Sequence, residues 1–131
     1  ASCSGVKIEL IIRGLCALRP GVKGVSENII VRSIIGRFLE HTRVFYFQNN
    51  GNAITYLSSA DWMGRNFFRR VEATFPIDDE RIANEVLGDL ELYLSDDSQS
   101  WTLNSDGTYT KVSDNQGEYA AQSELLRRIR M

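Results

Sequence analysis

The order of apolar and polar positions predicts a mixed α/β domain. Residues 7–13 alternate at first and then become fully apolar, which is typical of a strand entering a covered sheet. Residues 43–47 and 53–57 flank an Asn-Asn-Gly-Asn segment, which indicates a β-hairpin because Asn and Gly both tolerate positive φ. We also expect a strand over residues 70–75, stopped by Pro76, and a smaller hairpin from residues 101–103 and 108–112.

Helical spacing predicts two helices in the second half of the chain. Asp78 or Asp79 can cap the first, whose apolar positions are 82, 86, 87, 90 and 93 or 94. The second spans residues 118–130, and the cations of Arg127, Arg128 and Arg130 suit the dipole at its C-terminal end without any ligand. Residues 29–40 are ambiguous: their β-branched start favours a strand, but their later spacing predicts a short helix over 33–40.

Composition narrows the class of protein. The 131 residues are 43% apolar and 24% charged, enough to bury one globular core. No apolar run approaches the roughly 18 residues that would span a bilayer, so we expect no transmembrane segment. The N-terminal residues do not follow a signal-peptide pattern, and we expect a cytoplasmic location. Cys3 and Cys16 have neither metal-ligand nor disulfide-framework spacing, and we predict no metal site within this chain.

The net charge of -2 hides a division of charge along the chain. Residues 1–75 carry ten basic and five acidic side chains, whereas residues 76–131 carry five basic and twelve acidic ones. Twelve of the fifteen basic residues are Arg, whose planar fork suits bidentate contacts with phosphate or carboxylate groups. The first half therefore predicts a surface that meets an anion. Ordinary surface ion pairs are the alternative explanation of these arginines.

His41 is the one side chain whose unperturbed pKa lies near neutrality. If a strand begins there, the period of two puts His41 and Arg43 on one face. An imidazole beside a guanidinium predicts a phosphate site, in which one group moves a proton and the other holds charge. The alternative is a histidine that only hydrogen-bonds backbone.

Three further groups are candidates for the same site. Ser59 and Asp61 follow the hairpin and can share a face, although both are ordinary turn residues. Arg13 and the glycine after it end the first strand, where ligands gather in open α/β sheets. A basic cluster formed by Arg65, Arg69 and Arg70 either serves the site or forms a charged sheet edge that deters aggregation.

Several long stretches, in the same order, resemble the domain that closes the chain of polyphosphate kinases. They are residues 12–21, 26–28, 33–44, 56–63 and 69–72, and the match runs from about residue 5 to 112. Ile30 departs from the pattern, since many members have a basic residue there. The last twenty or so residues match less clearly.

The resemblance implies an α/β fold, a single phospholipase-D-like domain over residues 1–131 with a mixed β-sheet and flanking helices. Such folds pair two halves, each giving a His-x-Lys-type motif and a Gly-Ser-x-Asn-type turn. Here the segment from His41 to Arg43 is similar to the first element, with Arg in place of Lys. The segment from Ser58 to Asp61 is similar to the second, with Asp in place of Asn.

The activity implied by the resemblance is reversible transfer of the terminal phosphate of ATP, through a histidine of the preceding domain, to polyphosphate. His41 resembles the second active-site histidine and Arg13 an arginine on the nucleotide's phosphates. We expect Mg²⁺, with ligands outside this chain. The expected partners are ATP or ADP, inorganic polyphosphate, the upstream domains of the enzyme and further copies in a homo-oligomer, without nucleic acid.

Two other functions stay open at this point. One is a homodimeric phospholipase-D-like nuclease or phosphodiesterase, in which each copy gives one histidine. The other is a non-catalytic interaction domain, which would present a large apolar surface on the helix near residues 80–95 and bind neither ATP nor polyphosphate.

Overall fold

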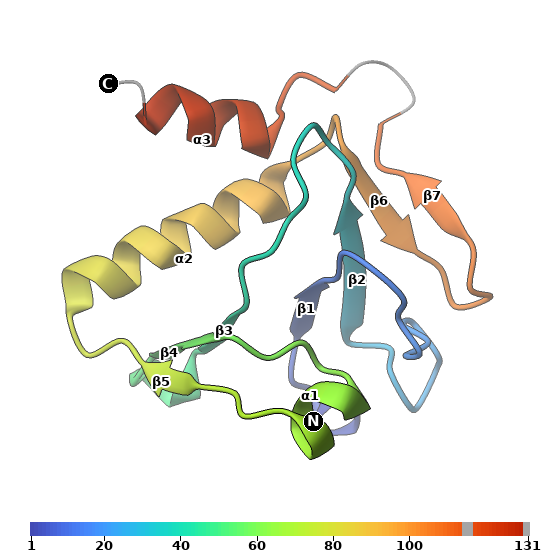
Figure 1. The fold of residues 1–131 in the computed structure, drawn as a ribbon. Helices are drawn as coiled ribbons and strands as arrows, with labels where there is room; N and C mark the ends of the chain where they lie inside the picture. The colour runs from blue at the N-terminus through green and yellow to red at the C-terminus, as the bar shows by residue number, and fades with distance from the viewer. Residues whose placement is uncertain (114–116, 130–131) are drawn as a thin grey trace. The chain divides into compact units, whose positions relative to one another are not determined.

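The computed structural model describes residues 1–113 and 117–129, which form a mixed α/β fold with two sheets (Figure 1). The chain divides into two compact units. Unit 1 comprises Ala1–Glu40 and Glu91–Met131, and unit 2 comprises His41–Leu90. The boundary lies inside the longest helix, α2 (Glu80–Ser95), whose last residues belong to unit 1.

Unit 1 is built on a four-stranded sheet in the order β1-β2-β6-β7. Strand β1 (Ile8–Ile11) runs parallel to β2 (Ile29–Ile34), which pairs antiparallel with β6 (Ser100–Leu103); β7 (Tyr109–Lys111) completes the second hairpin. Helix α3 (Ala121–Ile129) follows, and a short 3₁₀ turn, Ser2–Ser4, opens the chain. The buried apolar side chains of this unit are Val31, Ile34, Leu92, Leu103 and Ala121.

Unit 2 holds the three-stranded sheet β3-β4-β5. Strands β3 (Val44–Phe47) and β4 (Ile54–Ser58) form the predicted hairpin, joined through a 3₁₀ turn, Asn49–Gly51. Asn49, Asn50 and Gly51 all have positive φ, the property that predicted the turn. Helix α1 (Gly64–Arg69) precedes the short edge strand β5 (Thr74–Pro76).

The other expected elements are confirmed with small shifts. Helix α2 is capped by Asp79, whose Oδ1 accepts a hydrogen bond from the Ile82 N–H at 3.0 Å. Helix α3 begins three residues later than residue 118, where we expected it to begin, and Arg130 lies outside the described residues. Both cysteines are free thiols. Within the described ranges, no helix is long and apolar enough to cross a membrane.

Two predictions of local structure are wrong. Residues 33–40 do not form a helix, because residues 29–34 are the central strand β2, which β1 and β6 bracket through hydrogen bonds. Residues 70–75 are not a continuous strand: α1 ends at Arg69, and β5 begins only at Thr74 and includes Pro76. Proline is tolerated there because β5 is an edge strand.

Candidate functional site

The hairpin register explains how the candidate residues of unit 2 come together. Val44 pairs with Leu57, and the Ser58 N–H donates to the Arg43 carbonyl oxygen at 3.0 Å. The start of β3 therefore lies beside the end of β4. Two segments separated by a complete hairpin, one ending at Arg43 and the other running on to Asp61, become neighbours.

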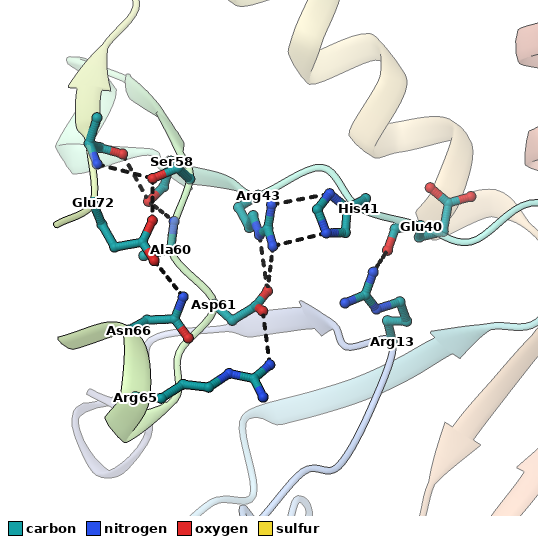
Figure 2. Close-up of polar contacts among 12 residues, drawn as sticks. Arg13, Glu40, His41, Arg43, Ser58, Ala60, Asp61, Arg65, Asn66 and Glu72 are labelled. Carbon is teal, nitrogen blue, oxygen red and sulfur yellow. Dashed lines mark hydrogen bonds and ion pairs between the residues drawn. The ribbon is translucent and has the colours of Figure 1, made fainter. Parts of the chain in front are cut away.

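His41, Arg43 and Asp61 form one connected array (Figure 2). Terminal nitrogens of Arg43 lie 3.3 Å from His41 Nδ1 and 3.2 Å from Nε2. On its other edge, Arg43 donates from Nε to Asp61 Oδ1 at 3.0 Å and from Nη2 to the same oxygen at 2.9 Å. Arg65 on α1 lies 3.7 Å from Asp61 Oδ2. His41 and Arg43 thus contact each other, but β3 begins only at Val44, so the strand from His41 that was expected to put them on one face is not formed.

Ser59 takes part in a second network, centred on Glu72. The Ser59 hydroxyl donates to one Glu72 oxygen and accepts from the Ala73 N–H at 3.0 Å, and Asn66 Nδ2 donates to the other oxygen at 2.6 Å. These two hydrogen bonds lower the pKa of Glu72 below its ordinary value, and the bond from Ser59 has the larger effect. Ser59 therefore faces Glu72, whereas Asp61 faces Arg43.

Sequence reasoning missed the roles of Asn66 and Glu72. Asn66 is 2% exposed, so its amide is one of the few buried polar groups of unit 2. Its position inside α1 was hidden because no helix was predicted there. The sequence offered only a weak signal for this network: Ser59 and Glu72 are a hydroxyl and a carboxylate at the two ends of one segment between strands.

The basic cluster of Arg65, Arg69 and Arg70 lies on α1 and the residue after it, and not on a sheet edge. The side chains of Arg69 and Arg70 make no hydrogen bond or ion pair with the residues that the structure describes. Both residues are exposed, and the charge of Arg70 helps to lower the pKa of Glu72, after the hydrogen bonds from Ser59 and Asn66.

Arg13 belongs to unit 1, where it follows β1. Its Nη1 donates to the Glu40 carbonyl oxygen at 2.6 Å, as Figure 2 shows. The Glu40 carboxylate is held in turn by Tyr93, whose hydroxyl donates at 2.8 Å, and by Gln122 Nε2 at 2.5 Å. Within the described residues, the remaining donors of Arg13 have no protein partner, so the exposed guanidinium keeps an edge for an anion.

The carboxylates around His41 do not fit a magnesium site. Asp61 is paired with Arg43 and Arg65, and Glu72 accepts from Ser59 and Asn66. A hard divalent cation needs several free oxygen ligands. No group of three or more His, Cys, Asp or Glu residues in the described ranges could hold a metal ion.

Comparison with known proteins identifies the family. The family model for "Polyphosphate kinase C-terminal domain 2" matches residues 1–123. A polyphosphate kinase of Pseudomonas syringae pv. tomato is 55% identical over 131 residues, and one of Paraburkholderia phytofirmans is 53% identical over 127. These alignments cover 98% and 96% of this chain, but only 18% of each relative.

A solved structure agrees with the sequence comparisons. The crystal structure of polyphosphate kinase from Porphyromonas gingivalis matches with a TM-score of 0.90 and 33% identity. The match covers 98% of this chain and 20% of that one, so the chain spans about a fifth of the proteins it resembles. The chain belongs to the polyphosphate kinase family, in which it matches C-terminal domain 2.

Proposed function

We propose that this chain is the part of a polyphosphate kinase that contacts the phosphates of ATP with His41 and Arg13. The complete enzyme transfers the terminal phosphate reversibly to inorganic polyphosphate, through a phosphohistidine in a preceding domain. The observation that carries the proposal is the His41–Arg43–Asp61 array, in a chain that belongs to this family.

The chemistry of phosphoryl transfer suits these two residues. The transferring group spreads negative charge over its oxygens, so most of the catalysis is positioning and electrostatic stabilisation. Arg13 supplies a charge that does not titrate, from an exposed guanidinium with one edge unused by described residues. His41 supplies a ring nitrogen that binds a phosphate oxygen or moves a proton to it, which contributes roughly 10²–10⁴ in rate.

Substitution of both residues in the full-length enzyme tests the proposal. His41→Ala and Arg13→Ala are each assayed for transfer of radiolabelled γ-phosphate from ATP into polyphosphate, with Arg81→Ala, in an exposed pair on α2, as the control. We expect His41→Ala to lower kcat by at least about 100-fold. Arg13→Ala should raise KM for ATP, and Arg81→Ala should change neither constant. A loss below about tenfold for His41→Ala would contradict the role of the ring.

The two alternative functions give different results in the same preparation. A nuclease or phosphodiesterase would hydrolyse a phosphodiester substrate in a His41-dependent manner without ATP. An interaction domain would present an apolar α2, but Ile82 is the exposed large apolar side chain of that helix, and the others are at least half-buried. The surface of α2 therefore favours the kinase proposal over the interaction domain.

A further inference from the structure

Arg43 uses both of the edges with which a guanidinium makes paired contacts. The edge formed by Nε and Nη2 is bonded to Asp61, and the edge formed by Nη1 and Nη2 faces the ring of His41. Only 19% of the Arg43 side chain is exposed. The residue is therefore arranged to hold another side chain in place, and little of it remains for an incoming phosphate.

The contact between Arg43 and His41 restricts the chemistry of the ring. A guanidinium has no acceptor, and an imidazolium has none either, so the two cations cannot form a hydrogen bond. A neutral imidazole has one acceptor nitrogen, which means that one of the two contacts is a hydrogen bond and the other is a close approach. Both ring nitrogens therefore face the Arg43 guanidinium, which sets the direction in which the ring points.

Asp61 is itself fixed from several directions. Its carbonyl oxygen accepts from the Met63 N–H at 2.8 Å, and the next residue, Trp62, stacks on Phe45 of β3 with 5.5 Å between ring centroids. Its carboxylate lies between Arg43 and Arg65 and is 24% exposed. Asp61 is thus the end of the array with more protein partners, and the His41 ring is its exposed end.

From this arrangement we infer that Asp61 is a positioning residue, which sets the orientation of the His41 ring by holding the Arg43 guanidinium against it. The inference rests on the proposed function, in which His41 contacts a phosphate group. It adds that the carboxylate works through Arg43. Removal of the acceptor frees the guanidinium to rotate, and the ring then loses its fixed direction.

A mutant cycle in the full-length enzyme separates positioning from mere stability. Asp61→Ala, Asp61→Asn, His41→Ala and the double variant of His41→Ala with Asp61→Ala are compared by kcat and KM for ATP. Glu85→Ala, which breaks an exposed carboxylate–guanidinium pair on α2, is the matched control. Thermal unfolding checks that each variant folds.

We expect Asp61→Ala to lower kcat at least tenfold and Asp61→Asn to stay within about threefold of the wild type, because the amide oxygen still accepts from Arg43. In the His41→Ala background, Asp61→Ala should have no further effect. If Asp61→Ala fails to fold, Arg43→Lys gives the test instead. Its ammonium keeps the charge beside Asp61 but lacks the second edge, so it should show the same loss and the same absence of effect on His41→Ala.

The outcomes distinguish two failures. An inactive His41→Ala together with an undiminished Asp61→Ala overturns the positioning role and leaves the proposed function intact. An undiminished His41→Ala overturns the proposed function itself. Equal losses from Asp61→Ala in both backgrounds show that the carboxylate acts independently of the ring, and an Asp61→Asn as impaired as Asp61→Ala shows that charge matters instead of geometry; both contradict the inference.

Discussion

Asp96 provides a direct test of what holds unit 1 around Arg13. It is 1% exposed, and its carboxylate accepts from two backbone groups: the Gln99 N–H at 2.7 Å and the Ala121 N–H at 2.8 Å, where α3 begins. A carboxylate at a helix N-terminus is favoured by the helix dipole as well as by these hydrogen bonds. The substitution Asp96→Ala removes both acceptors from a buried position.

The expected cost follows from these two contacts. A hydrogen bond to a charged group contributes about 1.5–3 kcal/mol, and a buried N–H left unpaired has a penalty of similar size. Allowing for some relaxation, we expect the free energy of opening α3 to fall by about 2–4 kcal/mol. At about 1.4 kcal/mol for each factor of ten, backbone amides of α3 should then exchange about 30-fold to about 700-fold faster.

The exchange rate of these amides is measured by hydrogen-exchange mass spectrometry of the full-length enzyme, on peptides that contain α3. The control is Asp78→Ala, since Asp78 is exposed and makes no hydrogen bond with the described residues. Exchange less than threefold faster in Asp96→Ala would refute the reasoning. More frequent opening of α3 should also raise KM for ATP. Gln122, at the start of α3, is hydrogen-bonded to the Phe38 backbone and to the Glu40 carboxylate, and the Glu40 backbone accepts from Arg13.

Three further predictions concern other parts of the chain. Gly36→Ala should lower the thermal unfolding temperature, because an added Cβ would displace the end of the Gln122 side chain, which is hydrogen-bonded to the Phe38 backbone. Glu72→Gln should destabilise the enzyme at pH 7. Since the folded-state pKa of Glu72 is lowered, its contribution is present above the unfolded value and lost as the pH falls through the folded value. The difference in unfolding temperature between wild type and Glu72→Gln should therefore shrink on acidification from pH 7 to below the ordinary Glu pKa of 4.5; a constant difference would contradict this. The isolated 131-residue chain should make no polyphosphate in the radiolabel assay, because the proposed phosphohistidine belongs to a preceding domain and not to these residues.

Local patterns predicted the elements that local interactions determine. The Asn-Gly turn between two apolar runs identified the β3–β4 hairpin, and helical spacing with an acidic cap identified α2. Both signals come from residues that are close in sequence. The sequence also predicted that His41 and Arg43 lie together, but on the assumption of a strand from His41; their contact forms in the segment that precedes β3.

The failures come from contacts between distant residues. Residues 29–40 carry both a β-branched start and a helical spacing, and the choice was made by pairing with β1 and with β6, the latter about 70 residues away. The network of Ser59, Asn66 and Glu72 depends on α1, which has no acidic or side-chain cap to reveal it. Such tertiary choices leave little trace in a single sequence.

Exposed aromatic side chains explain why the variants are compared in the complete enzyme. In unit 2, Ala60 is the buried apolar residue among those described, whereas Trp62 is 76% exposed and Phe68 is 87% exposed. A unit that buries so little apolar surface gains little stability from its own core. Its hydrogen-bond networks, and the further domains of the enzyme proposed above, are therefore expected to stabilise it.

A structure of the full-length enzyme with a non-hydrolysable ATP analogue tests the central claim most directly. The account predicts that the Arg13 guanidinium and a ring nitrogen of His41 both lie within hydrogen-bond distance, about 2.7–3.2 Å, of phosphate oxygens. It also predicts that Arg43 remains bonded to Asp61 and does not turn to the nucleotide. A nucleotide whose phosphates contact neither Arg13 nor His41 would contradict the account.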